Sequence, residues 1–129
     1  MQVRSILVAI FCVFLSLQAF AADKLGPRAT HKAVGAGNLI LVDIRRPDEW
    51  LATGTAKGAL RISMLSADFT TRIKSLQASN PGKKIAFICQ VGVRSARLSK
   101  SMEDQGLNGL VDVVGGTQLW IDQGLPVER

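Results

Sequence analysis

The chain alternates between short, continuous apolar runs and segments with helical spacing. Three apolar runs have the length expected of strands that are buried on both faces, at residues 39–43, 84–89 and 110–114. A shorter strand is predicted at residues 59–62. The intervening segments have helical spacing of apolar residues, a Pro start or a Gly stop, and they cover residues 27–34, 47–52, 66–77, 94–105 and 117–123. This alternation predicts an α/β fold with a mostly parallel central sheet and helices on both faces.

The first 21 residues have the pattern of a secretory signal peptide. A basic start with Arg4 precedes an uncharged apolar run from Ile6 to Leu17, and small residues end the segment at Ala21. The run is shorter than the roughly 20 residues that cross a bilayer. We expect cleavage after Ala21, which leaves residues 22–129 as a single periplasmic or secreted domain without a membrane attachment. An N-terminal anchor or a buried core helix is the alternative.

Charge and composition narrow the classes of partner. The full chain has 16 Lys and Arg against 10 Asp and Glu, a net charge of +6, and loss of the predicted signal peptide with its Arg4 leaves +5. The basic residues are scattered and aromatic residues are few, so no nucleic-acid partner is predicted. No cluster of His and Cys is present, and we expect neither a metal nor an organic cofactor.

Cysteine usage points to one residue. Cys12 lies inside the predicted signal peptide, so Cys89 is the only thiol of the mature chain and cannot form an internal disulfide. A lone cysteine in an exported protein indicates intermolecular pairing or a free reactive thiol. The alternative is a buried cysteine that acts as a small hydrophobic side chain.

The surroundings of Cys89 favour the reactive thiol. Cys89 closes a predicted strand at the carboxyl edge of the sheet, where ligands of parallel α/β folds bind. A short loop with Gly92 then leads into the helix that begins near Arg94. Backbone N–H groups of such a loop converge on one point, and the helix N-terminus adds partial positive charge there. The sequence therefore predicts an exposed thiol that is held as its reactive anion.

The sequence C-Q-V-G-V-R-S at residues 89–95 resembles the C-x-x-G-x-R-S active-site loop of rhodanese domains. Further motifs of that family match in the same order: L-V-D-I-R at residues 41–45 followed by P-D-E-W, a G-G pair at 115–116 followed by Trp120, and G-L-P-V at 124–127. The resemblance covers nearly all of the mature chain. It departs from the family's G-H-I-P-G-A stretch, where Thr55 replaces the His and Lys57 the Pro, which removes a structural hydrogen bond and a rigid turn.

The resemblance implies a sulfurtransferase that works by double displacement. The Cys89 thiolate would take the outer sulfur of a donor such as thiosulfate, hold it as a persulfide, and pass it to a nucleophile such as cyanide or a thiol, including a thiol carried by a protein. Substrate would be bound by the backbone N–H groups of the loop, which belong to Gln90, Val91, Gly92, Val93, Arg94 and Ser95.

The loop arginine and Asp43 each allow two interpretations. Arg94 either faces the donor anion or ties the loop to a nearby carboxylate, and we favour the second. Asp43 either orients the active loop or caps the next element, and the usual preference of Asp favours the cap. Arg45 and Glu49 are four residues apart and are expected to pair.

The aromatic residues and the histidine are predicted to be structural. Trp50 and Trp120 are expected in the core. His31 is expected on the surface and away from Cys89, so no Cys–His dyad is predicted.

Two other functions remain open from the sequence. Phosphatases and arsenate reductases also use a Cys-to-Arg loop, but tyrosine phosphatases have five intervening residues and this chain has four between Cys89 and Arg94. A non-catalytic rhodanese-like binding module is the second alternative, and the presence of Cys89 argues against it.

Overall fold

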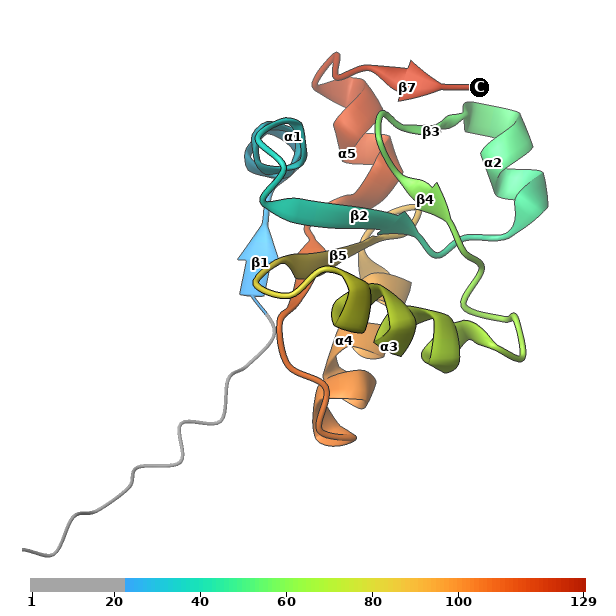
Figure 1. Ribbon diagram of the computed structural model, residues 1–129. Helices are drawn as coiled ribbons and strands as arrows, with labels where there is room; N and C mark the ends of the chain where they lie inside the picture. Colours follow the sequence, from blue (N-terminus) through green and yellow to red (C-terminus); the bar gives the residue numbers. More distant parts are fainter. Residues whose placement is uncertain (1–22) are drawn as a thin grey trace, which may run out of the picture.

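The computed structural model describes residues 23–129 (Figure 1). Its strands are β1 (Asp23–Leu25), β2 (Leu39–Asp43), β3 (Thr55–Ala56), β4 (Leu60–Arg61), β5 (Lys84–Ile88), β6 (Leu110–Val113) and β7 (Val127–Glu128). Its helices are α1 (Pro27–Gly35), α2 (Pro47–Thr53), α3 (Phe69–Ser79), α4 (Val93–Asp104) and α5 (Gly116–Asp122).

The central sheet is parallel and has the order β1-β6-β5-β2-β4, while β3 and β7 form a separate antiparallel pair. Strands β2 and β5 are neighbours, and their register runs from Leu39 opposite Lys84 to Asp43 opposite Ile88. From the carboxyl end of β2 the chain continues toward the β4 edge, and from that of β5 it continues toward β6. Such a reversal of direction opens a crevice at the ends of the two strands, where ligands bind in this class of fold.

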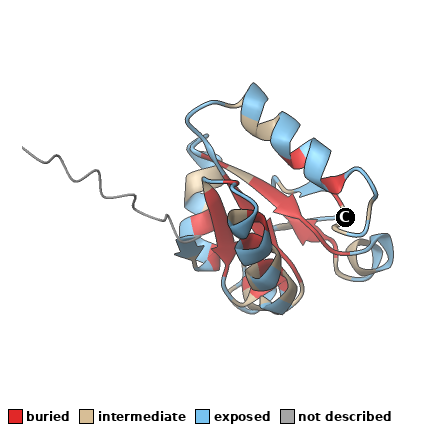
Figure 2. Ribbon diagram, turned by 90° about the horizontal axis from the view of Figure 1, so that it is seen from below, coloured by how far each residue is buried: buried red, intermediate tan, exposed pale blue. Residues whose placement is uncertain are grey.

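Helices cover both faces of the sheet (Figure 1), so the predicted fold class is confirmed. Two apolar clusters fill the space between the layers. One cluster joins the sheet to α3 and α4 and includes Val42, Phe69, Ile73, Phe87 and Met102. The other joins it to α1 and α5 and includes Leu41, Ala86, Val111, Val113 and Trp120. Figure 2 shows the buried strands between the more exposed helices, and burial on both faces explains why the strands appear as continuous apolar runs.

Most differences from the sequence prediction concern short or terminal segments. Strands β1, β3 and β7 were not predicted, because each has only two or three residues and lacks an apolar run. The helix expected from residue 66 begins at Phe69, since a turn in which the Phe69 N–H donates to the Ser66 carbonyl precedes it. Strand β5 ends at Ile88, so Cys89 is the first loop residue and α4 begins at Val93.

The stretch with Thr55 and Lys57 is ordered by pairing with the C-terminal segment. Thr55 is buried in β3 and lies opposite Glu128 of β7. The Lys57 N–H donates to the Pro126 carbonyl at 3.0 Å. Backbone pairing with the C-terminal segment therefore orders this stretch.

The predicted signal peptide, with Cys12, lies outside the described residues. Within residues 23–129, no helix is long and apolar enough to cross a membrane.

Candidate active site

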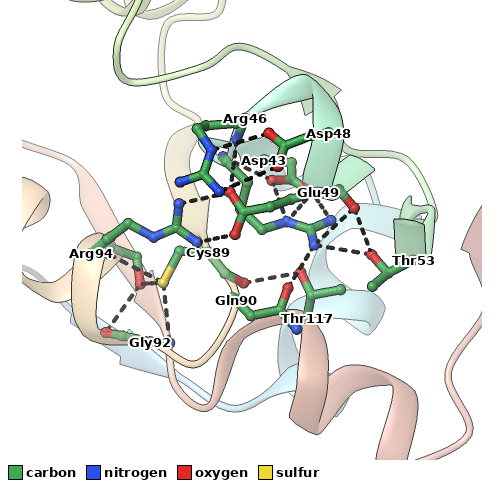
Figure 3. Close-up of polar contacts among 12 residues, drawn as sticks. Asp43, Arg46, Asp48, Glu49, Thr53, Cys89, Gln90, Gly92, Arg94 and Thr117 are labelled. Carbon is green, nitrogen blue, oxygen red and sulfur yellow. Dashed lines mark hydrogen bonds and ion pairs between the residues drawn. The ribbon is translucent and has the colours of Figure 1, made fainter. Parts of the chain in front are cut away.

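The sulfur of Cys89 lies inside the turn that leads from β5 to α4 (Figure 3). The N–H groups of Gly92 and Ser95 donate to Sγ at 3.1 and 3.4 Å, and the thiol donates to Ser95 Oγ at 3.3 Å. Gly92 has a φ of 95°, a left-handed conformation that glycine adopts without strain. This conformation lets the chain fold back so that two amides from different sides of the turn reach one sulfur.

The expected exposure of the thiol is wrong. Cys89 is only 1% exposed, and it contributes to the apolar cluster beneath α4. The reason is the turn itself, because residues 90–95 wrap around the sulfur and α4 begins directly above it. The side chains of Val91 and Val93 point outward instead and are 59% and 52% exposed.

The N-terminal end of α5 is hydrogen-bonded to the backbone of the loop around Cys89. The Thr117 N–H and Oγ1 both donate to the Cys89 carbonyl, at 2.8 and 3.0 Å, and the Gln118 N–H donates to the Gln90 carbonyl at 3.0 Å. A Cβ at Gly116 would lie 2.6 Å from the Cys89 carbonyl oxygen. The G-G pair therefore permits a close approach of two backbones that fixes the position of Cys89.

Arg45 and Asp43 form a fully buried ion pair that supports the loop from the side of β2. Arg45 Nη2 lies 2.8 Å from Asp43 Oδ2, and Arg45 Nη1 donates to Gln90 Oε1 at 2.8 Å. Asp43 also accepts the Arg45 backbone N–H. The residue at the N-cap of α2 is Arg46, so the favoured interpretation of Asp43 as a cap is wrong. Asp43 instead acts on the loop indirectly, by orienting Arg45.

The expected pair between Arg45 and Glu49 is wrong. Arg45 contacts only the backbone carbonyl of Glu49, at 3.5 Å, because Asp43 already takes its guanidinium. The Glu49 carboxylate instead forms two hydrogen bonds with Arg94, at 2.5 and 2.9 Å. Arg94 therefore ties the loop to a carboxylate, the structural reading that we favoured.

The Arg94–Glu49 pair is reflected in both ionisation equilibria. The hydrogen bond from Arg94 is the main reason that the pKa of Glu49 falls to about 2. The same hydrogen bond raises the pKa of Arg94. Both groups are therefore charged at neutral pH, and each neutralises the other beside the loop.

Asp112, which the sequence pattern did not single out, lies two hydrogen bonds from the candidate nucleophile, through Ser95. Ser95 Oγ donates to Asp112 Oδ1 at 2.6 Å, and the Asp112 side chain is 5% exposed. Lys24 Nζ lies 3.5 Å from the other carboxylate oxygen. A signal was present, since Asp112 is an acidic residue inside an otherwise apolar strand.

The aromatic predictions are correct in part. Trp120 is fully buried, and its indole N–H donates to the Pro126 carbonyl at 2.9 Å. His31 is half-buried rather than on the surface, because its ring packs edge-on against Trp120 with 5.5 Å between ring centroids. Trp50 is half-buried under the Arg61 guanidinium and belongs to neither apolar cluster.

The loop thus supplies one thiol and a ring of backbone donors at the end of β5. Val93 and Arg94 lie in the first turn of α4, where backbone N–H groups have no partner within the helix and can bind an anion. In the part of the chain that is described, no group of three or more His, Cys, Asp or Glu residues is arranged to hold a metal ion. The chemistry on offer is that of a sulfur nucleophile beside an anion-binding helix terminus, with the sulfur itself buried.

Comparison with known proteins gives relatives of two kinds, sulfurtransferases and tRNA uridine(34) hydroxylases. The putative sulfurtransferase YtwF of Bacillus subtilis is 33% identical over 68% of this chain and 79% of its own length. Thiosulfate sulfurtransferase 16, chloroplastic, of Arabidopsis thaliana is 29% identical over 76% of this chain and 86% of its own length. The tRNA uridine(34) hydroxylase of Rickettsia typhi is 26% identical over 84% of this chain, which spans only 44% of that enzyme.

A solved structure and a family model agree with these relatives. A rhodanese-related protein from Thermoplasma volcanium superposes with a TM-score of 0.66 at 28% identity, over 82% of this chain and 97% of that one. The model of the rhodanese-like domain matches residues 27–123, which include α1 to α5 and the whole loop around Cys89. The chain therefore belongs to the rhodanese-like domain family.

Proposed function

We propose that this protein is a sulfurtransferase that carries sulfane sulfur on Cys89. The observation that supports the proposal most directly is the sulfur of Cys89 held by the N–H groups of Gly92 and Ser95. Donors of this kind stabilise negative charge on sulfur, both in a thiolate and in the terminal atom of a persulfide.

The reaction proceeds in two displacements. The Cys89 thiolate attacks the outer sulfur of thiosulfate, a sulfur–sulfur bond to Sγ forms, and sulfite leaves with the electron pair of the bond that breaks. Cyanide or a thiolate then attacks the outer sulfur of the persulfide, and the Cys89 thiolate leaves. With cyanide the products are sulfite and thiocyanate, and the enzyme returns to its starting state.

The first turn of α4 binds the part of the donor that leaves. The N–H groups of Val93 and Arg94 lie in the first turn of α4 and donate to the oxyanion oxygens of the donor at the positive end of the helix. The two arginines next to the loop are already neutralised, Arg94 by Glu49 and Arg45 by Asp43. Backbone dipoles rather than a free cation therefore bind the donor, and small persulfide or polysulfide donors fit the same site.

Several features favour this reaction over the alternatives. Two of the relatives are named as sulfurtransferases. The four residues between Cys89 and Arg94 make a ring that already closes on a single sulfur, with little room for a tetrahedral phosphoryl group. A binding module would not require a thiol that accepts hydrogen bonds from backbone amides, as Cys89 does.

We also propose that the protein acts outside the cytoplasm. The order of a basic start, a short apolar run and small residues at Ala21 supports export and cleavage. N-terminal sequencing of the protein recovered from its native host tests this, with Ala22 as the expected first residue and Met1 as the contrary result.

The sulfurtransferase proposal is tested by measuring thiocyanate formed from thiosulfate and cyanide. Cys89→Ser should abolish turnover while leaving the fold unchanged, because an alcohol at this position does not hold sulfane sulfur. Leu65→Ala is the control, since this side chain is 72% exposed and lies outside the loop around Cys89. Equal thiocyanate formation by wild type and Cys89→Ser would contradict the proposal.

A further inference from the structure

A buried hydrogen-bonded chain runs from the candidate nucleophile to a carboxylate on the neighbouring strand. The Cys89 thiol donates to Ser95 Oγ at 3.3 Å, and Ser95 Oγ donates to Asp112 Oδ1 at 2.6 Å. All three residues are at most 3% exposed. We propose that Asp112 is a positioning residue that, through the Ser95 hydroxyl, favours the thiol form of Cys89 and so sets the pH at which this residue becomes nucleophilic.

The hydrogen-bonded chain from Cys89 to Asp112 contains too few hydrogens to serve two charged acceptors at once. The Ser95 hydroxyl has one hydrogen and can donate it to only one acceptor at a time. While Cys89 is a thiol, the hydroxyl accepts from sulfur and donates to Asp112, so every group is satisfied. Once Cys89 loses its proton, sulfur and carboxylate are both acceptors and compete for that single hydrogen. A buried charge without its donor is unfavourable, and the competition therefore opposes the thiolate.

The geometry indicates that Asp112 prevails in this competition. The contact between Ser95 Oγ and Asp112 is short, as expected for a hydroxyl that donates to a charged oxygen. Among residues 23–129, the other acceptor for this hydroxyl is the Gly92 carbonyl, at 3.3 Å. Turning the hydroxyl toward sulfur would leave Asp112 with its partner Lys24, whose side chain is 67% exposed and therefore screened by solvent.

Other charged groups near the chain are paired or lie at the surface. On the sulfur side, Arg94 is neutralised by Glu49. Asp112 borders a surface cavity of about 450 Å³, whose other charged lining residues are Lys24, Arg97, Lys100, Glu103 and Asp104. None of these lining residues is recorded as a hydrogen-bond donor to Ser95. The loop amides favour the thiolate, and Asp112 opposes it.

The inference rests on the proposed function in treating Cys89 as the nucleophile, but its test does not require sulfur transfer. The rate of Cys89 alkylation by iodoacetamide is measured against pH for wild type and Asp112→Asn. The substituted amide can donate to Ser95 Oγ, which frees the hydroxyl hydrogen for the sulfur. We expect the midpoint of the profile to fall by about one pH unit, which is a roughly tenfold faster reaction well below the midpoint.

Two further variants separate a relay through Ser95 from simpler effects. Ser99→Ala is the control, because Ser99 lies one turn further along α4, is buried, lines the same cavity and has a hydroxyl oxygen without a recorded partner in the described chain. Its midpoint should equal that of wild type. In a Ser95→Ala background, most of the shift caused by Asp112→Asn should disappear, because the hydroxyl that couples the two residues is absent.

Three results would overturn the inference. One is an unchanged midpoint in a folded Asp112→Asn protein, and another is a full shift that persists without the Ser95 hydroxyl. If Asp112→Asn does not fold, the same alkylation profile is measured for Lys24→Gln at low ionic strength, which removes the surface partner of Asp112. Loss of this cation strengthens the hold of Asp112 on the hydroxyl, so the midpoint should rise, and an unchanged or lower midpoint is the third contrary result. A protein that transfers no sulfur would still give these profiles.

Discussion

At the scale of single residues, backbone N–H groups hold the sulfur of Cys89 in place. Within residues 23–129, the hydrogen bonds donated to Cys89 Sγ come from the N–H groups of Gly92 and Ser95. This pair of N–H contacts was predictable, because a strand end, a glycine and a helix start in close succession bring backbone amides together. The contact from Ser95 to Asp112 was not predictable, since it depends on which strand lies beside β5 and on the register between them.

Gly116 is the residue at which a single methyl group should disturb the site most. It has a φ of 63°, and an added Cβ would lie 2.6 Å from the Cys89 carbonyl oxygen and 2.7 Å from that of Gln90. Gly116→Ala should lower the free energy of unfolding by about 2–4 kcal/mol through backbone strain and overpacking. It should also displace the loop and lower kcat/KM. Urea unfolding and the thiocyanate assay measure the two effects.

Gly37→Ala is the matched control for this substitution. Gly37 has a φ of 76°, but a Cβ there would meet no atom within 4 Å. The strain of the left-handed conformation remains and should cost about 1 kcal/mol, with no effect on turnover. Equal losses of stability in the two variants would contradict the role given to the close approach at Gly116.

At the scale of elements, α2 and α4 are joined by the pair Glu49–Arg94. The partners are 45 residues apart in sequence. The sequence placed Glu49 one turn from Arg45, and local spacing alone suggested the wrong partner. The correct pair depends on the tertiary arrangement, in which Asp43 takes Arg45 and leaves Glu49 facing the loop.

This pair should give the protein an acid-sensitive part of its stability. The pKa of Glu49 is lowered from 4.5 to about 2 in the folded protein. Because the folded pKa is depressed, the stabilisation is complete above pH 4.5 and is lost as the pH falls toward 2. Glu49→Gln should lower the free energy of unfolding near neutral pH by about 1–2 kcal/mol, a value that allows for the partial exposure of Arg94. The difference from wild type should vanish near pH 2.

Asp104→Asn serves as the control for the acid series. Asp104 pairs with Lys100 one turn away on α4, and both side chains are well exposed. Its replacement should change the unfolding free energy little at any pH. A constant difference between wild type and Glu49→Gln from pH 7 to pH 2 would show that the ion pair is not the source of the effect.

At the scale of the whole molecule, the order of elements was predictable from the sequence and the edges of the fold were not. Apolar runs such as Leu39–Asp43 and Lys84–Ile88 predict central strands, because burial on both faces requires them to be apolar throughout. Strands β3 and β7 have two residues each and exist only because distant segments pair. The candidate site lies at the ends of β2 and β5, two strands whose apolar runs were predictable from the sequence.

The measurement that tests the account most directly is the intact mass of the protein after exposure to thiosulfate or polysulfide and removal of the excess. The account predicts a gain of one sulfur atom on wild type, no gain on Cys89→Ser, and loss of the added sulfur when cyanide is supplied. Wild-type protein that gains no sulfur, or Cys89→Ser protein that gains as much as wild type, would contradict the claim that Cys89 carries sulfur.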